Sequence, residues 1–132
     1  MAGPGIAKQQ TSLRPVSLLD LYPTLIELAG LPAKPDLDGT SIVPLLKNPA
    51  AAWERPALTT AGFRSHALRT ERWRYIRYAD GSEELYDHGN DPLEQVNVSA
   101  RPEFAGVKEG LRKKLPSHDE PMNPPKGAGG DD

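Results

Sequence analysis

The chain of 132 residues contains no cysteine. This absence excludes disulfides, zinc sites built on thiolates and cysteine nucleophiles. No apolar run approaches the roughly 18 residues that a membrane-spanning helix requires. Residues 1–12 lack the apolar segment of a secretory signal peptide, so no export signal is expected within the chain.

An excess of one charge sign is also missing, because 16 basic and 18 acidic residues give a net charge of -2. This balance favours neither a nucleic-acid partner nor a membrane partner. Hydrophobic residues make up only 37% of the chain, whereas there are 14 prolines and 12 glycines. The composition predicts one modest core with irregular connections.

Helical periodicity occurs near both ends of the chain. An apolar stripe predicts a helix over residues 20–29, with Asp20 as its N-cap and Gly30 just past its end. The stripe consists of Leu21, Leu25 and Leu28. A second stripe follows Pro102 and predicts a terminal helix that reaches residue 115. It consists of Phe104, Val107, Leu111 and Leu115.

Between these helices the pattern changes to that of β-strands. Short segments rich in β-branched and aromatic residues predict a small antiparallel sheet of three or four strands. The segments are 57–61, 67–70, 73–79 and 83–86. Asp80-Gly81 is typical of a tight hairpin turn.

Three stretches of the chain together resemble a known family. Residues 4–31 contain an apolar segment that runs into Asp-x-x-Pro-Thr-Leu, and residues 38–46 read DGTSIVPLL. Residues 66–99 contain ELYD followed by a DP-x-E loop and an asparagine. In this order they resemble the C-terminal part of sulfatases, of the alkaline-phosphatase-like superfamily. The most similar subgroup is that of bacterial iduronate-2-sulfatase-like or choline-sulfatase-like enzymes.

The resemblance implies an α+β fragment. Residues 1–49 are expected to be the C-terminal edge of the sulfatase α/β core, with its last strand and helix. Residues 50–115 are expected to form the small antiparallel sheet with a terminal helix. Residues 116–132 lack apolar periodicity and are predicted to be a disordered tail.

Sulfate ester hydrolysis requires a nucleophile, a counter-charge for the sulfate oxygens and a proton donor for the leaving alcohol. The resemblance implies a formylglycine nucleophile, made within Cys/Ser-x-Pro-x-Arg, and a calcium ion in the full-length family enzyme. None of the 14 prolines has serine or cysteine two residues before it, so the motif is absent. We therefore expect no cofactor and no turnover from these residues alone. Full-length relatives are usually periplasmic or secreted, but the compartment of this chain is unknown.

Arg64 and His66 are the candidate substrate-binding residues, because the resemblance places their loop near the mouth of the active site. The alternative is a hydrogen-bonded loop histidine beside a solvated arginine. Asp87-His88-Gly89 matches the start of the family's metal motif, but the Leu-Gly-Glu that should follow is missing. We interpret His88 as a loop residue and predict no metal site.

Basic and aromatic residues alternate in the central hairpin, where a polyanion could bind. They are Arg69, Arg72, Trp73, Arg74, Tyr75, Arg77 and Tyr78. We favour a solvated, ion-paired strand face with Glu71, Glu83 and Glu84 as partners, and expect no nucleic acid. Trp53 is expected to anchor helix to sheet, and the sequon Asn97-Val98-Ser99 to be an ordinary loop.

Two functional hypotheses remain open. The first is the C-terminal piece of a sulfatase, whose partners are the rest of the sulfatase core and a sulfated carbohydrate at the pocket rim. This piece is either a truncated reading frame or a stand-alone protein. The second is a non-catalytic module that binds an anionic glycan or a protein. Under the first hypothesis the leucines of residues 20–29 are exposed in the isolated chain, which is then expected to be partly folded.

Overall fold

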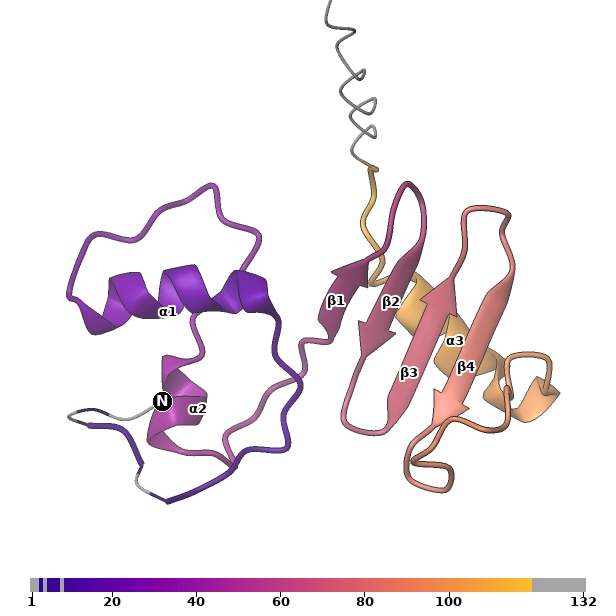
Figure 1. Cartoon of the computed structure of the whole chain (residues 1–132), viewed down its shortest axis with the longest axis horizontal. Coiled ribbons are helices and arrows are strands. Elements are labelled where there is room, and N and C mark those ends of the chain that lie inside the picture. Colours follow the sequence, from indigo (N-terminus) through magenta and orange to yellow (C-terminus); the bar gives the residue numbers. More distant parts are fainter. Residues whose placement is uncertain (1–2, 4, 8, 120–132) are drawn as a thin grey trace, which may run out of the picture.

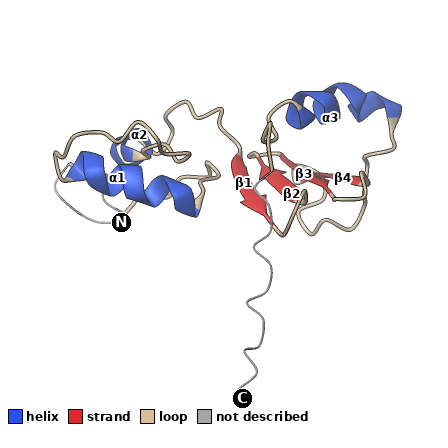
Figure 2. Ribbon diagram, turned by 90° about the horizontal axis from the view of Figure 1, so that it is seen from above, coloured by secondary structure: helices blue, strands red, loops and turns tan. Residues whose placement is uncertain are grey.

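The computed structural model describes residues 3, 5–7 and 9–119. An N-terminal helical part is followed by a four-stranded sheet that carries a helix on one face (Figures 1 and 2). Among the described residues, no helix is both long and apolar enough to cross a lipid bilayer. The predicted α+β composition is confirmed, and of the predicted tail only residues 116–119 lie within the described residues.

The N-terminal part contains the short 3-10 helix η1 (Leu18–Asp20), helix α1 (Leu21–Leu28) and helix α2 (Val43–Lys47). Helix α1 ends where predicted, because Gly30 adopts the left-handed conformation with φ of 67°. A small core forms around α2, where Ile42, Val43 and Leu45 are buried.

The sequence predicted that the Asp20 side chain caps α1, but it makes no capping hydrogen bond there. Its carboxylate instead accepts the backbone N–H of Ser17 and, 20 residues away, that of Thr40, both at 2.8 Å. The Thr24 hydroxyl accepts the N–H of Ile42 at 2.9 Å. Gly39 makes this approach possible, since a Cβ there would lie 2.0 Å from the carbonyl oxygen of Leu19. The motif of residues 38–46 therefore clamps its loop onto the start of α1.

The predicted last strand of the sulfatase core is wrong for this chain. The described residues before Ala57 contain no strand, and residues 13–17 run irregularly into η1. A strand needs a neighbour that pairs with its backbone amides and carbonyls, and no described residue before Ala57 belongs to such a neighbour.

The sheet is a simple antiparallel meander in the order β1-β2-β3-β4. Its strands are Ala57–Thr60, His66–Arg69, Trp73–Arg77 and Glu83–Asp87. All four predicted strands are therefore present, with ends that differ by one or two residues. Strand β3 stops before Tyr78, because the N–H of Tyr78 already bonds the Ser82 carbonyl to close the turn. Gly81 supplies the φ of 86° that this turn requires.

One row of apolar side chains crosses the whole sheet. Register pairs Leu58 with Leu68, Leu68 with Tyr75, and Tyr75 with Leu85. The last three of these residues are at most 1% exposed. The alternation of a strand places all four on the same face, the face covered by a helix in Figure 2.

The covering segment is the 3-10 helix η2 (Pro102–Phe104) followed by α3 (Ala105–Arg112). The four residues of the predicted stripe all pack against the sheet core, which confirms that prediction. They are Phe104, Val107, Leu111 and Leu115. The ring of Phe104 also meets that of Trp73 edge-on, with centroids 5.2 Å apart.

The N-terminal part leaves a broad apolar surface exposed, which we call the α1 face. The predicted stripe residues Leu21, Leu25 and Leu28 are 40%, 56% and 44% exposed. Large apolar neighbours add to the same exposed set: Leu13, Val16, Leu18, Leu19, Tyr22 and Leu31. The sheet thus has a core of its own, whereas α1 buries little apolar surface.

Replacement of Leu111 by alanine tests how firmly α3 holds the sheet. Leu111 is 6% exposed, and loss of such a buried leucine costs about 2–5 kcal/mol of unfolding free energy. The matched control is Leu93→Ala, because Leu93 is 76% exposed. Urea unfolding, followed by the near-ultraviolet circular dichroism of the aromatic core, should show a lower midpoint only for Leu111→Ala. Equal midpoints for both variants would contradict this packing.

Candidate functional site

An open cleft of about 550 Å³ lies between the β1–β2 loop and the segment that follows α3. Its wall includes both predicted substrate-binding residues, Arg64 and His66. Residues from the N-terminal part and from the C-terminal segment complete it, among them Asp20, Asp38, Arg55, Lys114, His118 and Asp119. Segments far apart in sequence therefore meet here.

His66 is the first residue of β2 and is 4% exposed. Its Nδ1 lies 2.9 Å from the Thr60 hydroxyl, directly opposite on β1. Its Nε2 lies 2.6 Å from Oδ1 of Asp119, which comes from beyond α3. Both ring nitrogens are thus engaged within the chain, as the hydrogen-bonded alternative for this histidine requires.

Arg64 occupies the tip of the β1–β2 loop, and its side chain is 60% exposed. Its φ of 60° is uncommon for a residue with a side chain, and nearby Gly62 has a φ of 81°. The guanidinium lies 5.0 Å from the Phe63 ring, and its Nε is 3.6 Å from Oδ2 of Asp119. Arg64 therefore presents positive charge to the cleft. Contact of Arg64 or His66 with substrate stays a prediction.

Two arginines of the central hairpin are ion-paired, but with partners other than those predicted. Arg72 forms two hydrogen bonds of 2.8 Å with Asp87, and Arg74 bonds Glu94 at 2.8 Å. The bond from Arg72 holds the pKa of Asp87 well below its ordinary value. The expected acidic partners are engaged elsewhere, since Glu71 pairs with Arg14, and Glu84 accepts from Tyr86.

His88 lies in the loop after β4, with both ring nitrogens bonded. Its Nδ1 is 2.8 Å from the Arg69 guanidinium, and its Nε2 is 2.5 Å from Glu94. An arginine can only donate, so Nδ1 accepts and Nε2 carries the proton. Within residues 3, 5–7 and 9–119 no group of three or more His, Asp or Glu side chains is arranged to hold a metal ion.

Trp53 lies in the linker between the two parts. Its indole N–H donates to the Pro15 carbonyl at 3.1 Å, and its ring lines a small hollow with Thr70 and Glu71 of the β2–β3 loop. This bond ties Trp53 to the segment before η1, whereas its role as an anchor between helix and sheet stays a prediction.

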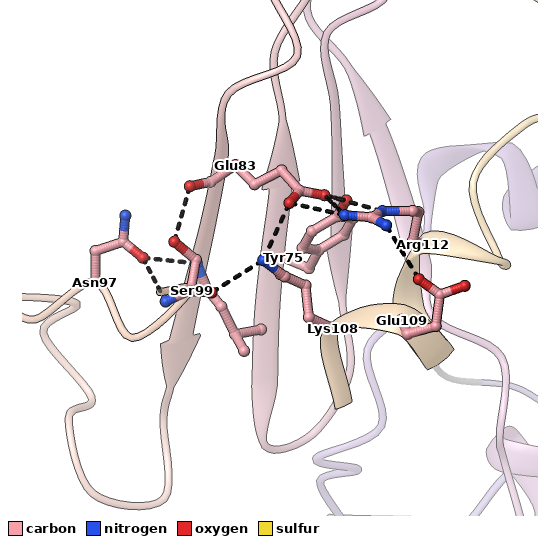
Figure 3. Close-up of polar contacts among 8 residues, drawn as sticks. Tyr75, Glu83, Asn97, Ser99, Lys108, Glu109 and Arg112 are labelled. Atoms are coloured by element: carbon pink, nitrogen blue, oxygen red, sulfur yellow. Dashed lines mark hydrogen bonds and ion pairs between the residues drawn. The ribbon is translucent and has the colours of Figure 1, made fainter. Parts of the chain in front are cut away.

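Glu83 was predicted only as a partner of the hairpin arginines, yet it is the centre of a polar cluster on the α3 side of the sheet (Figure 3). Its carboxylate accepts from the Tyr75 hydroxyl at 2.5 Å and from Arg112 at 2.7 Å, and lies 3.2 Å from Lys108. Burial acts to raise the pKa of Glu83, but these hydrogen bonds outweigh it and lower the pKa to about 2.

The cluster also gives Asn97 and Ser99 structural roles. The Asn97 side-chain oxygen accepts the N–H groups of Leu85 and Ser99, and the Ser99 hydroxyl donates to the Glu83 carbonyl. The sequence analysis did not predict these contacts or the pairing of Glu83 with α3. The signal for that pairing was the spacing of Lys108 and Arg112, which lie one helical turn apart on α3.

Residues 2–120 match the family described as "N-sulphoglucosamine sulphohydrolase, C-terminal". The chain belongs to this family. Membership confirms the resemblance to the C-terminal part of sulfatases, because the match covers most of the 132 residues.

Individual proteins that are similar to this chain agree with the assignment. The chain is 37% identical over 115 residues to a sulfatase of Formosa agariphila, covering 87% of this chain and 23% of that protein. It is 36% identical over 132 residues to arylsulfatase K of Mus musculus, covering 89% and 24%. The solved structure of a 2-O GAG sulfatase superimposes with a TM-score of 0.67 at 28% identity, covering 85% and 27%. The chain thus spans about a quarter of the length of these relatives.

Replacement of Glu83 by glutamine tests the polar cluster. The loss of hydrogen bonds to a charged group lowers the free energy of unfolding at pH 7 by about 2 kcal/mol. Because the pKa of Glu83 is lowered from 4.5 to about 2, its stabilisation is complete above pH 4.5 and disappears as the pH falls towards 2. Urea titrations at several pH values should show that the unfolding free energies of the unmodified chain and of Glu83→Gln become equal as the pH falls over this range.

The neighbouring Glu84→Gln is the control for the loss of one negative charge, since Glu84 interacts with tyrosine hydroxyls, those of Tyr86 and Tyr78. In Glu84→Gln, the difference between the free energies of unfolding at pH 7 and at pH 3 should be close to that of the unmodified chain. A Glu83→Gln protein that is as stable as the unmodified chain at pH 7 would contradict the proposed role of the cluster.

Proposed function

We propose that the chain is the C-terminal subdomain of a sulfuric ester hydrolase that acts on sulfated carbohydrate. The observation that carries the proposal is the family match over residues 2–120 in a sequence that lacks Cys/Ser-x-Pro-x-Arg. The subdomain closes one side of the enzyme and shapes the rim of the pocket, whereas the nucleophile lies in another part of the enzyme.

Within such an enzyme, this chain's own contribution is electrostatic. Arg64 places an exposed guanidinium in the cleft, where it can form paired hydrogen bonds with the oxygens of a sulfate group. His66 and Thr60 hold the loop that carries Arg64 at its base. These residues bind and orient an anionic substrate; they do not attack sulfur.

Calcium and formylglycine belong, in this proposal, to the part of the enzyme outside these residues. Calcium prefers several carboxylate and carbonyl oxygens that converge on one point. Two of the three acidic side chains that line the cleft have other partners: Asp20 accepts from backbone N–H groups and Asp119 lies against His66, and among the described residues no three His, Asp or Glu side chains converge to hold a metal ion. The described residues therefore do not fit a calcium ion, and we assign them no metal-dependent step.

The remaining part of the sulfatase core is the proposed partner of the α1 face. Covering the side chains of Leu21, Leu25 and Leu28 is worth roughly 1.5–3 kcal/mol for each one that becomes fully buried. An apolar surface of this kind on a soluble protein marks a contact with another protein segment. The family match supports the proposal that this segment is the rest of the sulfatase core.

Sulfated carbohydrate is the proposed substrate class. It is supported by the similarity to a 2-O GAG sulfatase and by the exposed arginine beside an aromatic ring in the cleft. The same similarity favours the iduronate-2-sulfatase-like subgroup over the choline-sulfatase-like one. A non-catalytic glycan-binding module is less well supported, because Arg69, Arg72 and Arg74 already have partners within the chain.

A hydrolysis assay tests this function. The purified chain, incubated with 4-nitrophenyl sulfate, should release no more nitrophenol than a heat-treated sample. A protein that extends the same reading frame upstream to include the nucleophile motif should hydrolyse the ester. The control is that extended protein with the motif serine or cysteine replaced by alanine. Turnover by the chain alone, or none by an extended protein confirmed to carry formylglycine, would contradict the proposal.

A further inference from the structure

The carboxylate of Asp119 lies in the cleft beside both predicted substrate-binding residues. One of its oxygens lies 2.6 Å from His66 Nε2, and the other lies 3.6 Å from Arg64 Nε. Its side chain is only 19% exposed, and it reaches the β1–β2 loop across 53 residues of sequence. A segment that has left helix α3 thus returns to deliver a negative charge to these two residues.

The chemistry of the contact does not distinguish a carboxylate from a sulfate. An ionised carboxylate only accepts hydrogen bonds, so His66 Nε2 carries a proton and its N–H donates the hydrogen bond to Asp119. A sulfate oxygen is likewise an acceptor, and the same N–H and guanidinium would serve it. Because His66 is 4% exposed while Asp119 is in place, an external anion reaches Nε2 only when Asp119 withdraws.

The surroundings favour an anion once Asp119 is displaced. Arg55, Arg64 and Lys114 line the cleft. The other carboxylates in its wall are those of Asp20 and Asp38. The Asp20 carboxylate is held by the N–H groups of Ser17 and Thr40 and lies 3.9 Å from Arg55. Withdrawal of Asp119 would therefore leave His66 and Arg64 without their carboxylate partner in a confined space.

We propose that Asp119 is an internal ligand of the Arg64–His66 site and competes there with the sulfate group of a ligand. The identity of the anion rests on the proposed function, whereas the competition itself rests on the geometry. The segment formed by residues 113–119 acts as a displaceable latch: it closes the site in the absence of ligand and lowers the apparent affinity by the fraction of time that it is closed.

The test measures binding to the full chain by the NMR signals of the His66 ring. The probes are inorganic sulfate and N-acetylglucosamine 6-sulfate, each at constant ionic strength, with N-acetylglucosamine as the uncharged control. Both anions should shift the His66 signals, and the uncharged sugar should not. If the latch is closed about nine-tenths of the time, Asp119→Asn should lower the apparent Kd roughly tenfold. Arg64→Gln should weaken binding.

Glu103→Gln is the control for the change in charge, since Glu103 lies on η2 and is not among the residues that line the cleft. An equal gain in affinity from Glu103→Gln, or no gain from Asp119→Asn, would overturn the proposal. So would loss of the amide signals of the sheet in Asp119→Asn, because the carboxylate would then be required for folding. Because binding is measured without turnover, failure here is distinguishable from failure of the hydrolysis assay.

Discussion

The contact between α3 and the apolar row of the sheet is the interaction on which the rest of the C-terminal part depends. Leu111 and its neighbours on α3 cover Leu68, Tyr75 and Leu85, which would otherwise lie on an open face. The same contact brings Lys108 and Arg112 over Glu83. It also directs the chain after α3 back towards the β1–β2 loop, so the packing of one helix builds a wall of the cleft.

The N-terminal part lacks an equivalent interaction. Its order comes mainly from polar clamps, with Asp20 and Thr24 holding the loop of residues 38–46. Most of its large apolar side chains remain exposed along the α1 face. This difference between a sheet with a buried core and an N-terminal part with exposed apolar side chains agrees with a chain that covers about a quarter of the length of its relatives. Under the proposed function, the rest of the sulfatase core covers this surface.

Local signals predicted much of the fold. The alternation of residue types in the strands and the apolar stripe on α3 depend on residues close in sequence. The glycines at positions 30 and 81 mark a backbone conformation that few other residues adopt. Contacts over long separations were not predictable in this way. Asp20 resembled an N-cap, but its carboxylate is used by Thr40; Glu83 resembled a strand charge, but α3 supplies two of its partners.

The candidate site shows the same limit. Arg64 and His66 were chosen from a resemblance, and the structure brings both into one cleft. Asp119 was expected to lie in a disordered tail, since nothing in its local sequence predicts a partner 53 residues away. Asp119 is held in place because the buried His66 needs a second hydrogen-bond partner.

We propose that the sheet with α3 is stable by itself, whereas α1 requires the rest of the sulfatase core. Amide hydrogen exchange on the purified chain measures this difference in stability. We predict slow exchange in β2, β3, β4 and α3, faster exchange in α1, and protection of α1 in the longer enzyme. Exchange in α1 as slow as in the sheet, for a monomeric chain, would contradict the claim.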